Sequence, residues 1–288
     1  MKPDNFTFLA KFLKDESGLV ITEEKAYLVE SRLVPVARKR GLADLDDLIV
    51  AVRQNKDPNL GKAVVEAMTT NESFFFRDIK PFESLKNTVL PQIVQIRKAA
   101  KATKIRIWSA ACSSGQEPYT IAMLLKENPA LLQGLNVEII GTDISNEILV
   151  KAREGIYTQF EAQRGLPIQL LMKYFTQVGE HWQINEDIRN AVQLKHANLL
   201  QDLRGLGKFD IVFCRNVLIY FDAPTKSEVL NRIRSMMPGD GYLFLGAAET
   251  VVGISDRFKT IPGERGVYAA DAAATAPAPA VQPIAKSA

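Results

Sequence analysis

The chain has 288 residues, of which 47% are hydrophobic and 24% are charged, a composition typical of a folded globular protein. This length predicts two domains, since one domain commonly has roughly 100 to 200 residues. The formal net charge of +3 gives little support for a nucleic-acid partner. The two cysteines, Cys112 and Cys214, lie too far apart in the sequence to favour a disulfide framework or a zinc site.

The first residues, MKPDNFTFLAKFLKDESG, mix apolar and charged side chains, whereas a secretory signal peptide has an uninterrupted apolar centre. No window approaches the roughly 20 apolar residues that are needed to cross a bilayer. We therefore expect a cytoplasmic protein that is not inserted in a membrane.

Apolar residues recur at three- and four-residue steps from Phe6 to Met68, as they do on one face of an α-helix. Breaks at Ser17-Gly18, Gly41 and Asp57-Pro58 divide this region into about four helices. We expect residues 1–80 to form an all-helical domain. A linker helix is expected over residues 81–104, because Pro81 is well suited to the start of a helix.

From residue 105 onward, short apolar runs rich in β-branched residues alternate with helical stretches. The runs are 105–111, 136–143, 209–216 and 241–249, and the helices lie at 118–128, 145–153 and 224–237. This alternation predicts an α/β domain with a parallel sheet over residues 105–270. Residues from about 172 to 196 alternate around a turn at Gly179-Glu180 and predict a small antiparallel β-subdomain. The alanine- and proline-rich residues 271–288 are expected to be disordered.

The strongest local feature is IRIWSAACSSGQEPYTIAMLL at residues 105–125, a strand followed by small residues and a helix. Small residues allow a ligand to approach the backbone at the carboxyl end of a strand, where Glu117 would project beside the loop. The next strand ends at Asp143, which is well placed for ribose hydroxyls. Only Gly115 occurs in the loop, so a pyrophosphate site is disfavoured and a nucleoside without phosphates is favoured. An ordinary tight turn explains the same residues equally well.

Five segments together resemble the motif series of the chemotaxis receptor methyltransferases, the CheR family. They are TNESFFFRD (70–78), SAACSSGQEPYTIAMLL (109–125), GTDIS (141–145), FDIVFCRNVLIYFD (209–222) and PGDGYLFLGAAE (238–249). The resemblance implies a small all-helical domain followed by a Rossmann-like methyltransferase domain with an inserted β-subdomain. It also implies transfer of a methyl group from S-adenosyl-L-methionine to glutamates on the cytoplasmic helical bundle of chemotaxis receptors. S-adenosyl-L-homocysteine would be the second product, and no metal is implied.

Carried over by position, the resemblance places the cofactor contacts on Asn71, Ser73, Arg77, Glu117, Asp143, Asn198, Leu199, Asn216 and Val217. Ser73 stands where the family often has threonine, and both residues carry a hydroxyl. The roles we expect are ribose binding for Asp143, adenine recognition for Asn198, and binding of the methionine end for Arg77 with Glu117. An interdomain salt bridge is the alternative role for Arg77, and a turn cap is the alternative for Asn198.

Carboxylate methylation requires no general base, because a glutamate with a reference pKa of about 4.3 is already ionised at neutral pH. Arg77 and Tyr220 are the candidate catalytic residues, although Tyr220 can equally be a packing residue. Substrate binding is assigned to the basic residues Arg32, Arg38, Lys39 and Arg40. The alternative is that these positive charges only stabilise the carboxyl end of a helix.

The turn at Gly179-Glu180 is short, whereas family members that dock on a tethering peptide resemble one another in a longer loop there. We therefore expect an enzyme that does not need a receptor's carboxyl-terminal pentapeptide. We also expect a monomer, because no heptad seam demands an oligomer. Two other functions remain open at this point. One is a nucleic-acid methyltransferase that uses residues 216–220 as a degenerate Asn-Pro-Pro-Tyr motif, and the other is a non-catalytic module that binds the cofactor.

Overall fold

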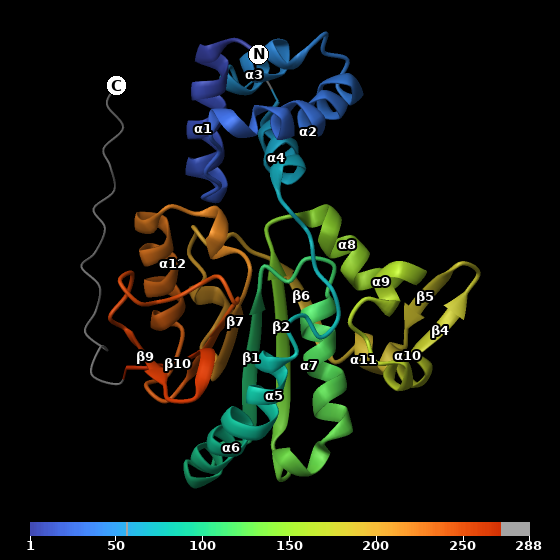
Figure 1. Cartoon of the computed structure of the whole chain (residues 1–288), viewed down its shortest axis with the longest axis vertical. Coiled ribbons are helices and arrows are strands. Elements are labelled where there is room, and N and C mark those ends of the chain that lie inside the picture. The colour runs from blue at the N-terminus through green and yellow to red at the C-terminus, as the bar shows by residue number, and fades with distance from the viewer. Residues whose placement is uncertain (56, 272–288) are drawn as a thin grey trace.

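The computed structural model describes residues 1–55 and 57–271. Figure 1 shows a helical domain above a larger α/β domain, with a small sheet projecting from one side of the larger domain. The expected disorder of residues 271–288 falls, apart from Asp271, outside the described residues.

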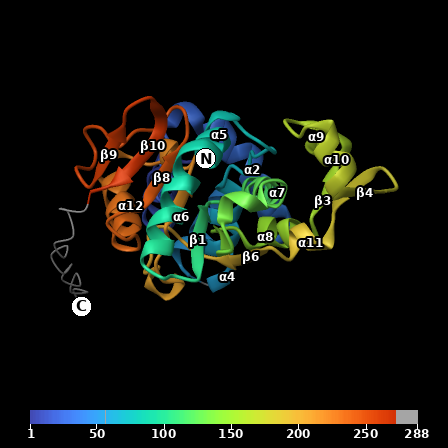
Figure 2. The same ribbon diagram turned by 90° about the horizontal axis from the view of Figure 1, so that it is seen from below.

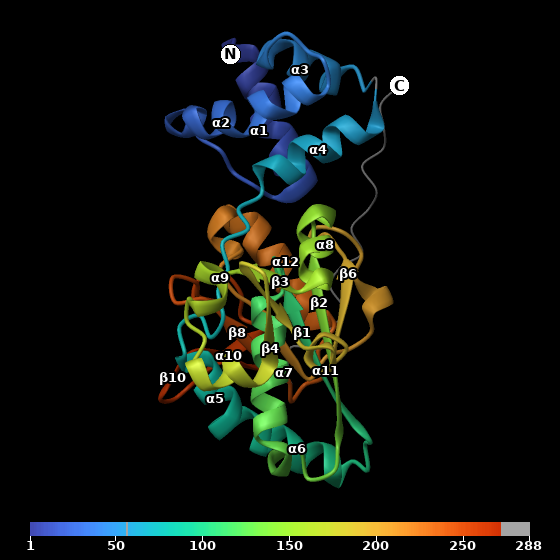
Figure 3. The ribbon, with the colours of Figure 1, turned by 90° about the vertical axis from the view of Figure 1, so that its right-hand side faces the viewer.

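The amino-terminal domain consists of α1 (Pro3–Ser17), a 3-10 turn (Glu23–Lys25), α2 (Ala26–Lys39), α3 (Leu45–Arg53) and α4 (Pro58–Met68). The helices are separated at the breaks that the sequence predicts. Gly18 ends α1 at φ 77°, and the Asp44 side chain caps α3 by accepting from the Asp47 N–H. Leu13, Leu33 and Leu48 are fully buried where the four helices meet. The helices end at Met68, and residues 69–79 run down to the larger domain (Figure 3).

The predicted linker helix forms as α5 (Lys80–Ser84), one π-helical stretch (Leu85–Val89) and α6 (Leu90–Ala99). Pro91 lies just after the π-helical stretch, and proline has no backbone N–H for the hydrogen-bond ladder. Phe82, Leu85 and Ile93 bury one side of this helix against the sheet.

Seven strands form the main sheet in the order β6-β2-β1-β7-β8-β10-β9. They are β1 (Lys104–Ala110), β2 (Asn136–Asp143), β6 (Val192–His196), β7 (Ile211–Cys214), β8 (Tyr242–Leu245), β9 (Phe258–Ile261) and β10 (Glu264–Ala270). The first five in that order are parallel, and β10 runs antiparallel to β8 and β9. The strand order reverses between β1 and β7, and doubly wound sheets bind ligands beyond the carboxyl ends of the strands at such a point.

Each strand sends alternate side chains to opposite faces of the sheet. On one face Ile107 and Phe213 join the core beneath α5, α6 and α7 (Gln116–Glu127). Trp108 and Val212 belong to the core on the other face, which α12 (Ala223–Ser235) covers. Figure 2 shows α6 and α12 beside the strands. The remaining elements of the α/β unit are α8 (Asn146–Glu154) and 3-10 turns at Pro129–Leu132, Arg204–Leu206 and Leu218–Tyr220.

The small sheet has the order β3-β5-β4, with β3 (Ile156–Thr158), β4 (Phe175–Val178) and β5 (His181–Ile184). It is flanked by α9 (Gln159–Gln163), α10 (Ile168–Tyr174) and α11 (Glu186–Arg189). The predicted bounds of 172–196 are therefore wrong at both ends. The subdomain begins at β3, which is too short to show an alternating pattern, and β6 pairs with β2 of the main sheet.

Candidate functional site

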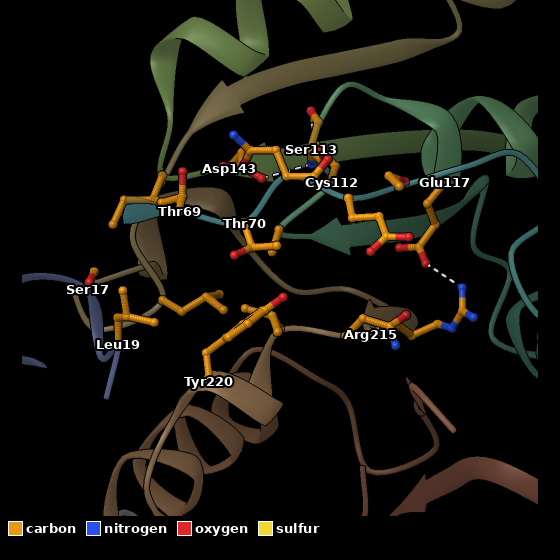
Figure 4. Close-up of a pocket in the computed structure, with 18 of the residues that line it drawn as sticks. Ser17, Leu19, Thr69, Thr70, Cys112, Ser113, Glu117, Asp143, Arg215 and Tyr220 are labelled. Atoms are coloured by element: carbon orange, nitrogen blue, oxygen red, sulfur yellow. Dashed lines mark hydrogen bonds and ion pairs between the residues drawn. The ribbon is translucent and has the colours of Figure 1, made fainter. Parts of the chain in front are cut away.

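A cleft of about 1020 Å³, counting the part open to solvent, lies at the carboxyl ends of β1, β2 and β7 and below the helical domain. Figure 4 shows side chains converging on it from both domains. The structure brings together all ten residues assigned above to cofactor binding or catalysis. These lining residues are Asn71, Ser73, Arg77, Glu117, Asp143, Asn198, Leu199, Asn216, Val217 and Tyr220.

The loop between β1 and α7 forms one wall of the cleft in an unusual backbone conformation. Ala111 and Ser113 have φ values of 55° and 51°, and Gly115 has φ 91° where α7 begins. Non-glycine residues in this region are uncommon and often mark ligand sites. The Cys112 N–H donates to the Thr142 carbonyl at 2.9 Å, so the loop is fixed to the end of β2.

Asp143 ends β2 and is only 5% exposed. Its Oδ2 accepts from the Ser113 N–H at 2.9 Å, and its Oδ1 accepts from the Ser145 N–H at 3.0 Å. Burial raises the pKa of this carboxyl, while these backbone donors oppose the shift. A carboxylate has about four acceptor sites, so each oxygen retains capacity for a ligand hydroxyl.

Glu117 projects from the first turn of α7 toward β7 (Figure 4). Its Oε1 accepts from the Ser109 hydroxyl at 2.8 Å, and its Oε2 forms a 2.8 Å ion pair with Arg215. Arg215 also lines the cleft, and the sequence analysis missed it. The signal was a charged residue placed directly after the four buried residues of β7.

Residues 69–79, here called the crossing segment, form a second wall of the cleft. The Ser113 hydroxyl donates to the Asn71 carbonyl at 2.8 Å, and the Phe76 N–H donates to the Thr120 hydroxyl at 3.1 Å. Arg77 donates to the Glu72 carbonyl at 2.9 Å and makes no ion pair within the described ranges 1–55 and 57–271. The structure thus gives no support to the interdomain salt bridge considered for Arg77.

Asn198 joins the two domains at the edge of the cleft. Its Nδ2 donates to the Glu16 carbonyl at 2.7 Å, and its Oδ1 accepts from the Leu200 N–H at 2.9 Å. The turn-cap role is therefore present in the structure. A side-chain amide carries two N–H donors, and the bond to Glu16 uses one of them. Adenine recognition through the second donor stays a prediction.

The loop after β7 is held by a carboxylate that the sequence analysis also missed. Glu249 is 9% exposed and accepts from four backbone N–H groups: Asn216 at 2.7 Å, Gly246 at 2.7 Å, Val217 at 2.9 Å and Ile219 at 3.3 Å. These bonds fix Asn216 at φ 60°. Tyr220 follows in the same loop and projects into the cleft (Figure 4). Its carbonyl accepts from the Val20 N–H of the helical domain at 3.0 Å.

Comparison with known proteins identifies the family. A model described as "CheR methyltransferase, SAM binding domain" matches residues 71–267, and one described as "CheR methyltransferase, all-alpha domain" matches residues 4–69. This chain belongs to the CheR methyltransferase family. Chemotaxis protein methyltransferase Cher2 of Pseudomonas putida is 40% identical over 260 residues, which cover 89% of this chain and 94% of that protein. Chemotaxis protein methyltransferase 1 of Pseudomonas aeruginosa is 40% identical over 267 residues, covering 91% and 96%.

In this CheR-family chain none of the four predicted substrate-binding residues is among those that line the cleft. Arg38 and Lys39 are exposed at the end of α2, and Arg40 forms a 2.7 Å ion pair with Asp57. Arg32 has another role, because its guanidinium donates to the Met68 and Thr69 carbonyls and to the Thr70 hydroxyl. It therefore anchors the start of the crossing segment.

The described part of this CheR-family protein, residues 1–55 and 57–271, contains no cluster of three or more His, Cys, Asp or Glu side chains that could hold a metal ion. Within the same ranges, no helix has the length and apolar character to span a membrane. Burial raises the pKa of the Cys112 thiol, which lines the cleft, so this group is kept neutral and is a poor nucleophile.

Proposed function

We propose that this chain transfers a methyl group from S-adenosyl-L-methionine to glutamate side chains on the cytoplasmic helical bundle of chemotaxis receptors. The observation that carries the proposal is the cleft itself. It lies at the switch point of the sheet, and it gathers every residue that the CheR resemblance assigns to the cofactor. The relatives described above carry the name chemotaxis protein methyltransferase.

The residues of the cleft fit the three chemical parts of S-adenosyl-L-methionine. Asp143 is a buried carboxylate with free acceptor capacity for ribose hydroxyls. Leu199 and Val217 supply apolar contacts for an adenine ring, beside the amide of Asn198. Arg77 and Glu117 offer one cation and one anion to the carboxylate and ammonium of the methionine end. We propose these assignments, with Asn71, Ser73 and Asn216 as further contacts.

The reaction requires alignment more than acid-base catalysis. When bound, the cofactor supplies a methyl group on a sulfonium, which moves to a carboxylate oxygen as the carbon–sulfur bond breaks and its electron pair returns to sulfur. The substrate glutamate is already ionised near neutral pH, so no side chain has to remove a proton. Arg77 and Tyr220 would orient the incoming carboxylate and exclude water beside it.

The test is transfer of radiolabelled methyl from S-adenosyl-L-methionine to the purified cytoplasmic domain of a receptor. We expect a label that mild alkali releases as methanol and that is absent with an Asp143→Ala variant. Alkali-stable label on nucleic acid would instead support the nucleic-acid methyltransferase. Tight cofactor binding with no label on a panel of receptors would support the non-catalytic module.

We also propose that the enzyme acts as a monomer in the cytoplasm and without a receptor's carboxyl-terminal pentapeptide. The support for the last point is the tight turn between β4 and β5, where only Gly179 and Glu180 connect the strands. Calorimetry with the pentapeptide should show no saturable heat, and saturable binding would refute this part of the proposal. Light scattering of the purified chain should give the monomer mass.

A further inference from the structure

The crossing segment is strained where it passes the cleft. Phe76, Asp78 and Ile79 have φ values of 52°, 69° and 38°, and they surround Arg77 in the sequence. Side chains other than glycine rarely adopt such values, and a β-branched residue such as isoleucine is a clear outlier. Conformations of this kind persist only where surrounding contacts hold them. The position of Arg77 therefore depends on what fixes its backbone.

Arg215 provides that contact from the end of β7. Its side chain is only 1% exposed, and its guanidinium lies 5.7 Å from the centre of the Phe82 ring. The Nη2 group donates to the Arg77 carbonyl at 2.8 Å and to the Asp78 carboxylate at 2.7 Å. Two hydrogen bonds from one nitrogen thus hold the backbone and a side chain of the strained segment.

The other nitrogen of the same guanidinium reaches the opposite wall of the cleft. Nη1 donates to Glu117 Oε2 at 2.8 Å, and Glu117 Oε1 is already bound by the Ser109 hydroxyl. Figure 4 shows this ion pair at the far end of the cleft from Asp143. A planar guanidinium can bind both partners at a fixed separation, whereas a lysine ammonium is a single point charge on a flexible chain.

We propose that Arg215 is a positioning residue, which sets the distance between the Arg77 segment and Glu117 so that the two can bind the charged methionine end of S-adenosyl-L-methionine. This inference rests on the proposed function. It assigns no chemical step to Arg215, whose effect on the cofactor passes through Arg77 and Glu117. The structure supports it because one buried side chain contacts both walls, which are far apart in the sequence.

Arg234 offers a matched control for a purely structural effect. It is 3% exposed and, like Arg215, has a buried Nε for which residues 1–55 and 57–271 provide no hydrogen-bond partner. Its two terminal nitrogens donate to the Met237 and Asp271 carbonyls, and it does not line the cleft. Replacing either arginine by lysine removes hydrogen bonds from a buried guanidinium, but only Arg215 lines the cleft.

The first experiment measures S-adenosyl-L-homocysteine binding to the full chain by calorimetry for Arg215→Lys and Arg234→Lys. Arg215→Lys removes charge-assisted hydrogen bonds that hold the Arg77 segment and Glu117 in place, so we expect it to weaken binding about 10- to 100-fold. Arg234→Lys should lower the melting temperature but leave the affinity within about twofold. Equal affinities for the two folded variants and the wild type would overturn the inference.

A second experiment tests the coupling between the two walls. Asp78→Asn, at an exposed position, should weaken cofactor binding in the wild-type background and have almost no effect when Arg215 is already methionine. In the methylation assay, Arg215→Lys should raise KM for S-adenosyl-L-methionine more than it raises KM for the receptor, whose carboxylate Arg77 would also orient. Equal effects of Asp78→Asn in both backgrounds would contradict the proposal. A wild-type chain that binds no S-adenosyl-L-homocysteine would instead contradict the proposed function.

Discussion

Asp143 organises the cleft by accepting from two backbone N–H groups, and its carboxylate keeps acceptor capacity for the proposed ligand. Replacing it by asparagine leaves one acceptor oxygen, so either the Ser113 or the Ser145 N–H loses its partner. The change also removes the charge that, in the proposed function, faces the ribose. We expect Asp143→Asn to weaken S-adenosyl-L-homocysteine binding about 10- to 100-fold, as measured by calorimetry. The control is Asp202→Asn, at an exposed carboxylate that pairs with Arg204. Unchanged affinity in Asp143→Asn would show that this carboxylate does not bind the ribose.

Glu249 determines the shape of the loop that carries Asn216 and Tyr220. A glutamine at this position would turn an N–H₂ group toward backbone N–H donors that now share the carboxylate. We expect Glu249→Gln to lower the free energy of unfolding by about 2 kcal/mol or more, measured by urea denaturation. Glu228→Gln, on the exposed side of α12, should change it by less than about 0.5 kcal/mol. A similar loss in both variants would mean that the four backbone contacts contribute little.

These residues also show what the sequence could predict at the residue scale. The place of Asp143 in the cleft was predictable, because an acid at the end of the second strand of a doubly wound sheet commonly binds ribose hydroxyls. Arg215 and Glu249 were missed because their roles depend on partners that are distant in the chain. Glu117 lies 98 positions from Arg215, and the Asn216 N–H lies 33 positions from Glu249. A motif shows that such residues are present, but only the fold shows what they contact.

The turn from β1 to α7 depends on Gly115 for two separable reasons. Its φ of 91° is unfavourable for any side chain, and an added Cβ would lie 2.7 Å from the Tyr119 ring. Gly134 has a similar φ of 87°, but no heavy atom of the part of the chain that the structure describes lies within 4 Å of an added Cβ. Both alanine variants should lose about 1 to 2 kcal/mol of unfolding free energy from the backbone. Gly115→Ala should lose about 1 to 3 kcal/mol more from the clash and should bind S-adenosyl-L-homocysteine more weakly. Equal losses in the two variants would rule out the packing contribution.

The pairing of β1 with β2 includes an ion pair between Arg106 and Glu138, which lie opposite each other in the register. The side-chain hydrogen bond from Arg106 lowers the pKa of Glu138 from 4.5 to about 2. A lowered carboxyl pKa stabilises the folded state above the unfolded value of 4.5 and loses this effect as the pH falls toward 2. The melting temperature of Glu138→Gln should therefore lie below that of the wild type at pH 7, and the difference should shrink as the pH falls below 4.5 toward 2. A difference that does not depend on pH would exclude this origin.

Elements were predictable in proportion to their length and burial. β1 and β2 have seven and eight residues with long apolar runs, and both were predicted within a residue or so of the observed bounds. β3 has only three residues, which cannot establish a period of two. β6 has an alternating pattern that suits an edge strand of either sheet, so its place in the main sheet depends on pairing with β2. The hairpin of β9 and β10 was not predicted.

At the scale of the whole molecule, the two domains form the cleft jointly. Ser17 at the end of α1 and Leu19 just after it line the cleft beside Asn198 and Tyr220. Lys14 forms a 2.6 Å ion pair with Asp222 next to this contact, and the Asn146 N–H donates to Glu66 across the same boundary. The sequence predicted two domains but not their contact. Amphipathic patterns show that a face is buried and do not identify which surface covers it.

The exposed basic residues Arg38 and Lys39 lie on the helical domain and not on the domain that carries the sheet. If they attract an acidic receptor bundle, Arg38→Glu with Lys39→Glu should raise KM for the receptor about 5- to 10-fold at low salt. Affinity for S-adenosyl-L-homocysteine should not change, because neither residue lines the cleft. The increase should shrink with added salt, since the screening length falls from about 10 Å at 0.1 M to about 3 Å at 1 M.

Lys98→Glu with Lys101→Glu is the matched control. It changes the net charge of the protein equally, but its two residues lie in the last turn of α6 and just after it, at the end of the molecule opposite α2 (Figure 1). If both double variants raise the receptor KM to the same extent, the overall charge attracts the receptor and α2 is not the docking surface. If the Arg38 and Lys39 variant keeps its receptor KM and only loses unfolding free energy, by about 0.3 to 1 kcal/mol per residue, these charges stabilise the carboxyl end of α2 instead. A KM effect restricted to that variant and abolished by salt would place the receptor against the helical domain.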